Sequence, residues 1–484
     1  MSSALRRGTA QPLRWASASS SNATIINTLR PCLAITKTNM ATRRHLHSSE
    51  RRTNTMVDQR PIPDPLPPVA PSKAPLSVLP LIMILRSLAT MTVSSSPMLL
   101  PPSLRVMGIL ANSTNPLLNS DKNPVLRYFL KKTFYAQFCA GERSPEIKQT
   151  IDGLKNIGFT GVILNYAKEV VLTKAEGKEL TNGAIETDEC IQNDILPWAR
   201  GTLETVRLAE PGDFVALKFT GAGSIALYQL KDRLPPSPVM YKSIDSICQL
   251  AHERGVRLLF DAEQDMLQDG IDDWTLEFMR KYNKGLGEAV IFGTYQAYKK
   301  KCPEVLSNHL QLAQAENFAL GVKLVRGAYL NSDPRELFHD TKEETDACFD
   351  SLSASVLTRE WNVDVKGAGK YPASSLVVAS HNAESVRRSR AIMEAGRAKS
   401  DIAFAQLQGM ADEVSCELVE ASQSDKTKVL PAYKYLVWGT TGECMKYLLR
   451  RAHENKDAVQ RTKGSRDALW AELVRRCKSV VGLA

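Results

Sequence analysis

The sequence lacks the patterns that mark common metal, nucleotide and acyl-transfer sites. It contains no H-E-x-x-H or clustered Cys/His, no G-x-x-x-x-G-K-[ST] phosphate loop and no G-x-S-x-G. Its nine cysteines are odd in number and scattered, without a C-x-x-C pair. This usage is typical of a protein from a reducing compartment and excludes a disulfide scaffold. We therefore expect no metal site.

Acidic residues are also missing from the N-terminal segment. None occurs before Glu50, and residues 1–60 carry ten Lys and Arg against two acids. The remainder has 52 basic and 50 acidic residues, so most of the net charge of +10 lies in the leader. A groove for nucleic acid needs a surplus of basic residues in the folded part, so we expect no nucleic-acid partner. An Arg- and Ser-rich, acid-poor leader predicts a mitochondrial transit peptide over residues 1–55. The alternative is a basic tail without a targeting role.

No uninterrupted apolar run is long enough to span a bilayer. Residues 60–80 are proline-dense, and the apolar run over 76–92 is broken by Pro80 and Arg86. We expect residues 56–124 to form an extended linker followed by a short helix. That helix would pack on the body of the protein or lie on a membrane surface.

From about residue 125, short β-rich apolar runs recur. They lie at 161–165, 214–219, 256–260, 289–293, 318–325, 376–380, 402–407 and 433–438, with helical stretches at 243–254, 275–282, 298–318, 336–357, 383–395 and 442–453. This alternation predicts an α/β fold, a closed (βα)8 TIM-type barrel over 125–460 that need not be regular, with an N-terminal helical extension and a helical tail over 461–484. A doubly wound dinucleotide-binding sheet is the weaker alternative, because no G-x-G-x-x-G follows the first strand.

Cationic, amide and aromatic side chains follow these strands and lie on the last helix of the barrel. The active site of a (βα)8 enzyme lies at the C-terminal ends of its strands. The residues found there are Lys218, Asp261, Gln296, Lys323, Arg326, Tyr329, His381, Asn382, Leu407, Gln408, Gly409, Tyr435, Tyr447, Arg450 and Arg451. Such a set suits an anion, either a substrate carboxylate or a cofactor pyrophosphate, because arginine binds such groups with a planar fork of donors.

Each of these residues also has a structural interpretation. Arg450 and Arg451 could form a solvated helix face. Lys218 and Lys323 could be buried structural lysines, with Asp261 as an ion-pair partner. The His-Asn pair after the sixth strand fits a helix N-cap. Singly, none of these residues indicates a function.

Together, the motifs resemble those of the proline dehydrogenase family. The resemblance rests on the runs Arg257–Glu263, Lys323–Tyr329, Ala379–Asn382 and Leu407–Met410 and on the segment Tyr435–Asn455. It covers roughly residues 125–460. The leader and the Pro-rich stretch with its apolar segment resemble mitochondrial, fungal members.

The resemblance implies an FAD-dependent barrel that oxidises L-proline to Δ1-pyrroline-5-carboxylate, the first step of proline degradation to glutamate. Electrons would pass to a membrane quinone, with peripheral contact to the matrix face of the mitochondrial inner membrane. Carried over by motif, the substrate pocket consists of Lys218, Asp261, Tyr329, Leu407, Tyr435, Tyr447, Arg450 and Arg451, with the two arginines on the carboxylate. The expected FAD contacts are Gln296, Lys323, Arg326, Gly327, Ala328, His381, Asn382, Gln408, Gly409 and Glu454.

One residue departs from the family pattern, and three rival functions stay open. Bacterial members carry Arg where this chain has Lys323, which keeps the charge but loses the fork of donors. Within the class, the rival is a hydroxyproline dehydrogenase. From other classes, the rivals are an aldolase that forms a Schiff base on Lys218 or Lys323 and a catalytically inactive barrel that serves as an interaction scaffold.

Overall fold

The computed structural model describes residues 74–170, 186–285, 287–330, 332–425, 427, 429–455 and 459–482. The described residues all lie in one compact unit that spans Gln59–Ala484. The expected transit peptide and most of the Pro-rich stretch fall outside the described residues. The side chains of 454, 455 and 459–461 are likewise outside them.

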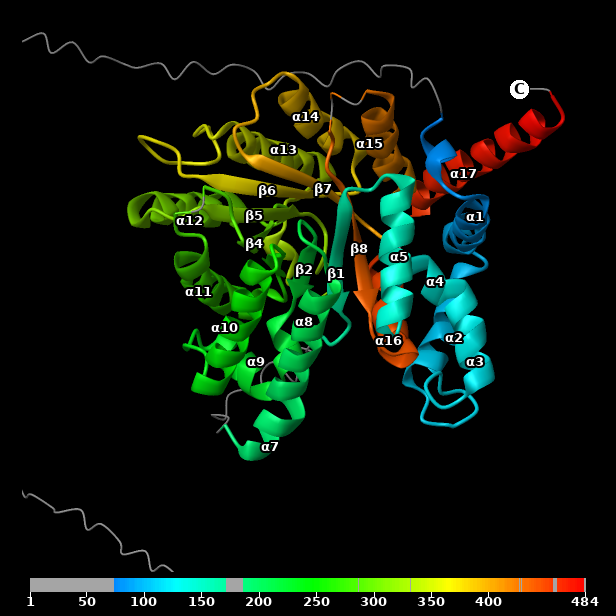
Figure 1. Ribbon diagram of the computed structural model, residues 1–484, viewed down its shortest axis with the longest axis horizontal. Coiled ribbons are helices and arrows are strands. Elements are labelled where there is room, and N and C mark those ends of the chain that lie inside the picture. The colour runs from blue at the N-terminus through cyan, green and yellow to red at the C-terminus, as the bar shows by residue number, and fades with distance from the viewer. Residues whose placement is uncertain are drawn as a thin grey trace, which may run out of the picture. The chain divides into compact units, whose positions relative to one another are not determined.

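Eight parallel strands close into a barrel in chain order, as the sequence predicts (Figure 1). They are β1 (Gly161–Tyr166), β2 (Phe214–Leu217), β3 (Arg257–Phe260), β4 (Ile291–Gln296), β5 (Leu320–Val325), β6 (Ser374–Ala379), β7 (Asp401–Leu407) and β8 (Ala432–Trp438). The last strand pairs with the first, with Ile163 opposite Tyr435. The predicted (βα)8 fold is therefore confirmed.

Helices follow the strands and cover the outside of the barrel. They are α8 (Leu196–Leu208), α9 (Ser224–Lys231), α10 (Pro238–Glu253), α11 (Asp265–Tyr282), α12 (Cys302–Glu316), α13 (Lys342–Thr358), α14 (Ala383–Glu394) and α15 (Asp412–Ser424), with α5 (Ser144–Ile157) preceding β1. The helix α16 (Thr441–Asn455), which follows β8, instead packs with Tyr447 and Leu448 on the apolar cluster inside the barrel. The sequence analysis missed α5, α8, α9 and α15. It also began α11 ten residues late, since Gly270 is a poor helix former in isolation.

Side chains alternate between the two faces of each strand, and this alternation aims the polar residues inward. Phe214 and Ala216 of β2 belong to the apolar cluster inside the barrel, whereas Val215 and Leu217 belong to the cluster beneath the helices. With a period of two, the next inward position after Phe214 and Ala216 is Lys218. The same parity places Asp261 above Leu259 on β3. Strand geometry therefore brings these two charges to the barrel mouth.

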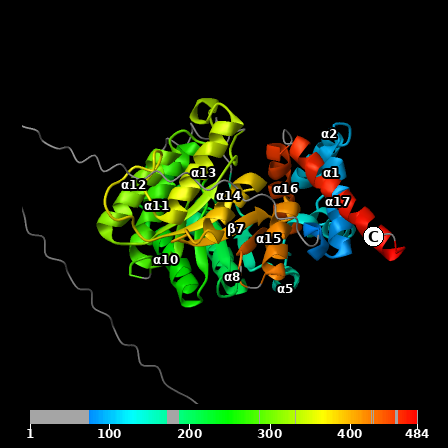
Figure 2. The same cartoon turned by 90° about the horizontal axis from the view of Figure 1, so that it is seen from above.

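Besides the short α4 (Ala136–Phe138) and α7 (Asp188–Cys190), longer helices lie outside the barrel repeat. They are α1 (Leu81–Ser95), α2 (Leu100–Asn112), α3 (Pro124–Leu130) and the C-terminal α17 (Val459–Val480). The helix α1 packs against α17, and α2 packs against α16 (Figure 2). One face of α1, with Ile84 and Met91, is buried, so the expected packing on the body holds for that face. Among the described residues, no helix has the length and apolar character needed to cross a bilayer.

Alanine substitution at two helical glycines should change the stability of the protein in opposite directions, because only Gly270 lies where α11 packs on α9. A Cβ at Gly270 would collide with the backbone of Leu230, 2.7 Å from its carbonyl carbon. We expect Gly270→Ala to lower the free energy of unfolding by about 1–3 kcal/mol, because backbone must shift to admit the methyl group. The matched control is Gly153→Ala in α5, where the added Cβ meets nothing within 4 Å. Ala is the better helix former, so this variant should gain up to about 1 kcal/mol in urea unfolding.

Candidate active site

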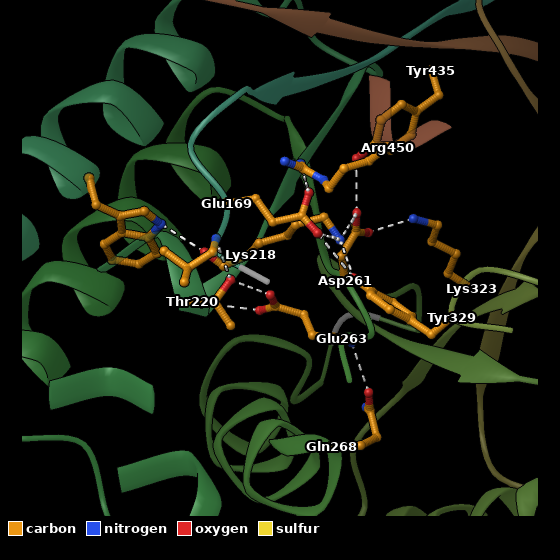
Figure 3. A network of polar contacts seen from close by, with 12 residues as sticks. Glu169, Lys218, Thr220, Asp261, Glu263, Gln268, Lys323, Tyr329, Tyr435 and Arg450 are labelled. Carbon is orange, nitrogen blue, oxygen red and sulfur yellow. Dashed lines mark hydrogen bonds and ion pairs between the residues drawn. The ribbon is translucent and has the colours of Figure 1, made fainter. Parts of the chain in front are cut away.

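A buried carboxylate, Asp261, is the centre of the barrel mouth (Figure 3). One oxygen accepts a hydrogen bond from Lys323 Nζ at 2.5 Å, and the other accepts one from the Tyr435 hydroxyl at 2.9 Å. Lys218 Nζ lies 3.8 Å from the second oxygen. These four residues come from β3, β5, β8 and the end of β2, so Asp261 ties together strands from around the barrel.

A second buried carboxylate, Glu169, follows β1. Its Oε2 accepts a 2.6 Å hydrogen bond from Arg450 Nη2, and its Oε1 accepts one from the Tyr329 hydroxyl at 3.2 Å. Lys218 Nζ lies 3.8 Å from Oε1 and 3.3 Å from the Tyr329 hydroxyl. Arg450 therefore faces the mouth and not bulk solvent. The structural interpretation of this arginine as a solvated helix face is wrong.

The charges in the mouth depend on one another. Burial favours the neutral acid, but Lys218, Arg450 and Arg451 outweigh it and lower the pKa of Glu169 to about 2. Burial also opposes ionisation of Asp261, yet Lys323 and Lys218 hold its pKa below the ordinary value. Both carboxyls are thus ionised at neutral pH and act as counter-charges. Neither can accept a substrate proton readily.

The two buried lysines respond to this environment in opposite directions. Glu169, Tyr329 and Asp261 outweigh the effect of burial and raise the pKa of Lys218 well above its ordinary value. Burial instead lowers the pKa of Lys323, against the opposing charge of Asp261. Lys218 is therefore a fixed cation. Lys323 keeps its proton less firmly, and the charge of Asp261 is what opposes its loss.

A third acid, Glu263, lies beside this cluster and differs from the other two in its hydrogen-bond partners and in the direction of its pKa shift. It accepts hydrogen bonds from the backbone nitrogen of Thr220 at 3.1 Å and from the Thr220 hydroxyl, while its own backbone nitrogen donates to Gln268 Oε1 at 3.0 Å (Figure 3). Burial outweighs the attraction of Lys218 and raises the pKa of Glu263 to about 7. Glu263 thus holds the turn that follows Lys218, and its carboxyl titrates near neutral pH.

Several residues expected to contact a cofactor are engaged within the chain. Gln296 donates from Nε2 to Gln268 Oε1 at 3.2 Å and accepts from the Tyr298 hydroxyl. Arg326 forms an ion pair with Asp346 of α13, away from the central cluster. His381 Nε2 accepts from the backbone nitrogen of Leu407 at 3.1 Å.

The remaining expected residues occupy varied positions. Asn382 caps α14, since its side chain accepts from the backbone nitrogen of Glu384, and this confirms the N-cap interpretation. Tyr447 is buried on α16, Leu407 is half-buried at the end of β7, and the Arg451 guanidinium lies 5.6 Å from the Tyr447 ring. Gly327 and Gly409 have left-handed backbones, and Ala328 lies half-buried beside Gly327. The side chain of Glu454 lies outside the described residues.

The donor set at the mouth fits a bound anionic cofactor. Gln408 Oε1 is buried and, within the part of the chain that the structure describes, has no hydrogen-bond partner. A buried polar atom of this kind costs free energy unless a ligand or water satisfies it. Gln408 Oε1 is an acceptor, so it needs a donor N–H or O–H from the ligand. Lys323 on β5 and the amide nitrogen of Gln408 after β7 supply donors for carbonyl and phosphate oxygens. The residues present are therefore compatible with FAD.

Sequence reasoning missed functional residues in the loops. Glu169 lies three residues past the end of β1, in the loop that follows the first strand. The signal was present, because Glu169 is the first carboxylate after that strand. Lys299 was also missed. It is 2% exposed and contacts Asp333 at 2.8 Å and Asp265 at 3.0 Å, joining the loops after β3, β4 and β5.

A closed (βα)8 barrel with a buried cluster of paired cations, carboxylates and tyrosines at the C-terminal ends of its strands defines an enzyme of the β/α-barrel class. A family model described as "Proline dehydrogenase" matches residues 147–464. The chain belongs to the proline dehydrogenase family. The predicted family and its oxidoreductase class are confirmed.

Relatives and a solved structure agree with this assignment. "Probable proline dehydrogenase, mitochondrial" of Schizosaccharomyces pombe is 32% identical over 408 residues, which cover 73% of this chain and 80% of the relative. "Hydroxyproline dehydrogenase" of Bos taurus is 27% identical over 382 residues, covering 72% and 81%. The crystal structure of proline utilization A from Bdellovibrio bacteriovorus, inactivated by N-propargylglycine, aligns with a TM-score of 0.56 at 17% identity, over 76% of this chain and 38% of that one. The structural likeness supports the fold.

Replacing the buried, ion-paired Lys299 by a side chain of similar volume should strongly lower the stability of the protein. Lys299→Met leaves the buried Asp333 without its cation, and we expect a loss of about 3–5 kcal/mol in the free energy of unfolding. The matched control is Lys300→Met, which removes an exposed pair with Asp340 at 3.2 Å. This control should change stability by less than about 1 kcal/mol. Equal losses in the two variants, measured by urea unfolding, would contradict a special role for Lys299.

Proposed function

We propose that the chain is an FAD-dependent enzyme that oxidises L-proline to Δ1-pyrroline-5-carboxylate. Family membership supports the reaction class. The observation that carries the assignment of this mouth as the active site is the Asp261 cluster, with Arg450 turned toward it. A small zwitterionic amino acid needs cations for its carboxylate and a wall for its ring, and this mouth supplies both kinds of group.

The arginines of α16 bind the substrate carboxylate. Arg450 already holds a carboxylate, that of Glu169, at 2.6 Å in the structure. The same donors can hold the carboxylate of proline if Glu169 gives way, and Arg451 is the next residue on the same helix. Buried tyrosines at positions 329, 435 and 447 then flank the pyrrolidine ring. Two fixed charges and rigid aromatic walls orient the substrate and exclude water.

When bound, FAD supplies the electron acceptor for the oxidation. Lys323, Gln408, Gly409 and the loop Arg326–Ala328 would hold it, together with Gln296, His381, Asn382 and Glu454. In this proposal Asp261 keeps Lys323 and Tyr435 in fixed positions. Glu169 and Asp261 stay ionised, so they balance the cations and do not take the amine proton.

The rival functions are less well supported. Schiff-base chemistry needs a lysine that is neutral at working pH. The raised pKa of Lys218 works against that role. Burial lowers the pKa of Lys323, but its Nζ is occupied by the 2.5 Å contact with Asp261, which a Schiff base would have to break. An inactive scaffold has no need of a buried charge cluster, which is costly to maintain. The hydroxyproline alternative stays within the family, and comparing turnover of the two substrates tests it.

We further propose that the electrons leave for a membrane quinone and that the protein works in the mitochondrion, in peripheral contact with the matrix face of the inner membrane. The acid-poor leader and the mitochondrial label of the fission-yeast relative support the compartment.

An anaerobic titration tests the proposed reaction. The purified protein should be yellow, and L-proline added without oxygen should bleach the visible flavin bands within the mixing time. 4-Hydroxyproline should bleach them more slowly at equal concentration. A colourless protein that accepts no added FAD would overturn the cofactor assignment, and a flavin that stays oxidised with proline would overturn the substrate.

Replacing one arginine tests the carboxylate site. We expect Arg451→Met to raise the KM for proline by about 10- to 100-fold, because a charge-assisted hydrogen bond to the carboxylate is lost. The visible spectrum should stay that of the bound flavin. Arg451→Lys, which keeps the charge but not the fork, should give an intermediate KM. An unchanged KM in the Met variant would show that the carboxylate binds elsewhere.

A further inference from the structure

The N-terminal helices expose a large set of apolar side chains on one part of the molecule. We call it the α2–α3 surface and define it by its members: Leu99, Val106 and Ile109 on or beside α2, Leu117 and Leu118 in the following loop, and Val125, Tyr128 and Phe129 on α3. Leu117 is 74% exposed, Val125 77% and Phe129 60%. Exposed single apolar residues are ordinary, but such a density of large ones within residues 99–129 is typical of an interaction site.

The spacing of these residues shows that they share helix faces. Val106 and Ile109 are three residues apart, and Val125 lies three and four residues before Tyr128 and Phe129. The opposite faces of both helices are already buried: Met107 and Ala111 of α2 and Leu130 of α3 belong to the apolar cluster at the barrel mouth. A helix that is apolar on both faces normally packs on both sides. The outer faces therefore lack a covering partner among the described residues.

The charge around this surface has one sign. Between residues 74 and 135 the sequence has one acid, Asp121, against six Lys and Arg. Asp121 is turned to α16, where it accepts a 2.8 Å hydrogen bond from the backbone nitrogen of Gly442. The basic side chains of Arg105, Lys122 and Lys132 are exposed on the same helices and loop.

We propose that the α2–α3 surface docks into the interface of a bilayer that contains anionic lipid. Exposed aromatic and aliphatic side chains together with Lys and Arg are the composition of interfacial membrane anchors, in which apolar groups enter the acyl boundary and cations meet the headgroups. A second copy of this chain is a poorer occupant, because a twofold contact would bring the same basic residues face to face. This inference deepens the membrane contact proposed above and rests on it.

The position of the surface gives the docking a functional meaning. In both views α2 lies beside α16, the helix that carries Tyr447, Arg450 and Arg451 (Figures 1 and 2). The buried faces of α2 and α3 share one apolar cluster with Tyr435 and Tyr447. Docking by the outer faces therefore places the active-site helix one helix layer from the lipid. An electron acceptor dissolved in the bilayer would then meet the enzyme on the side where substrate is oxidised.

Vesicle binding of the full chain tests the surface. The probes are vesicles of pure phosphatidylcholine and vesicles in which about one fifth of the lipid is cardiolipin. The variant Val106→Ser/Ile109→Ser/Phe129→Ser should lose at least about tenfold in partition to the anionic vesicles, because three apolar side chains no longer enter the interface. The variant Arg105→Gln/Lys132→Gln should lose binding to the anionic vesicles and not to the neutral ones. The matched control is Val363→Ser/Val429→Ser, which removes two exposed valines elsewhere, and it should bind as the unchanged protein does.

A second measurement separates this surface from the basic leader, which is present in every variant. Hydrogen exchange by mass spectrometry should show peptides within 99–132 protected on anionic vesicles, with no change in peptides within 360–370. Protection confined to residues 1–60, or unchanged partition of the triple-Ser variant, would overturn the proposal. Chemical cross-links between two copies of the chain, without protection of residues 99–132 by lipid, would assign the surface to a second copy. That result would overturn the proposed docking to a bilayer as well.

Activity assays keep this proposal distinct from the proposed function. With a soluble dye as acceptor, the triple-Ser variant should oxidise proline at the unchanged rate, since none of its three positions touches the Asp261 cluster. With a quinone dissolved in the vesicles, its rate should fall at least about tenfold. If the triple-Ser variant reduces both the dye and the quinone at the normal rate, the docking surface is refuted and the proposed reaction is not. Absence of dye-linked oxidation in the unchanged protein refutes the reaction.

Discussion

The barrel mouth depends on a buried carboxylate. Asp261 contacts Lys323 at 2.5 Å and the Tyr435 hydroxyl at 2.9 Å, with Lys218 at 3.8 Å. Without it, two buried lysines would repel each other in a region of low dielectric, and each would lose its proton or move toward water. The residue therefore fixes the charge state of the site as well as its shape. Asp261 shares this task with Glu169, the second buried carboxylate, which pairs with Arg450 and lies 3.8 Å from Lys218.

Around this centre, the loops at the strand ends form two further layers of support. Glu169 holds Arg450 and Tyr329, while Glu263 and Gln268 hold the turn after Lys218. Further out, Lys299 joins three successive loops through two aspartates. Each layer uses a charged group that is paired within the chain, so the side chains that face the mouth have few alternative positions. This is the preorganisation that a site relying on orientation requires.

The sequence was sufficient for the barrel but not for all of the site. The eight strands are evident because their apolar runs are buried on both faces, and parity along β2 and β3 then places Lys218 and Asp261 inside. Glu169 was not predicted, because a loop residue past a strand end carries no periodic signal. The turn of Arg326 toward Asp346 was not predicted either, since it depends on where α13 packs. The N-cap role of Asn382 was foreseen as an alternative, because capping is a local property.

The pairing of β1 with β8 and of α2 with α16 joins segments from opposite ends of the polypeptide. Contacts of such high sequence separation form late, because the chain must close a very long loop before they contribute. The packing of α2 on α16, the helix that carries both arginines, therefore requires that both segments have been synthesised and have met. A polypeptide still emerging from a ribosome or crossing a translocation pore cannot yet bind its substrate, so catalytic competence and full delivery of the chain coincide.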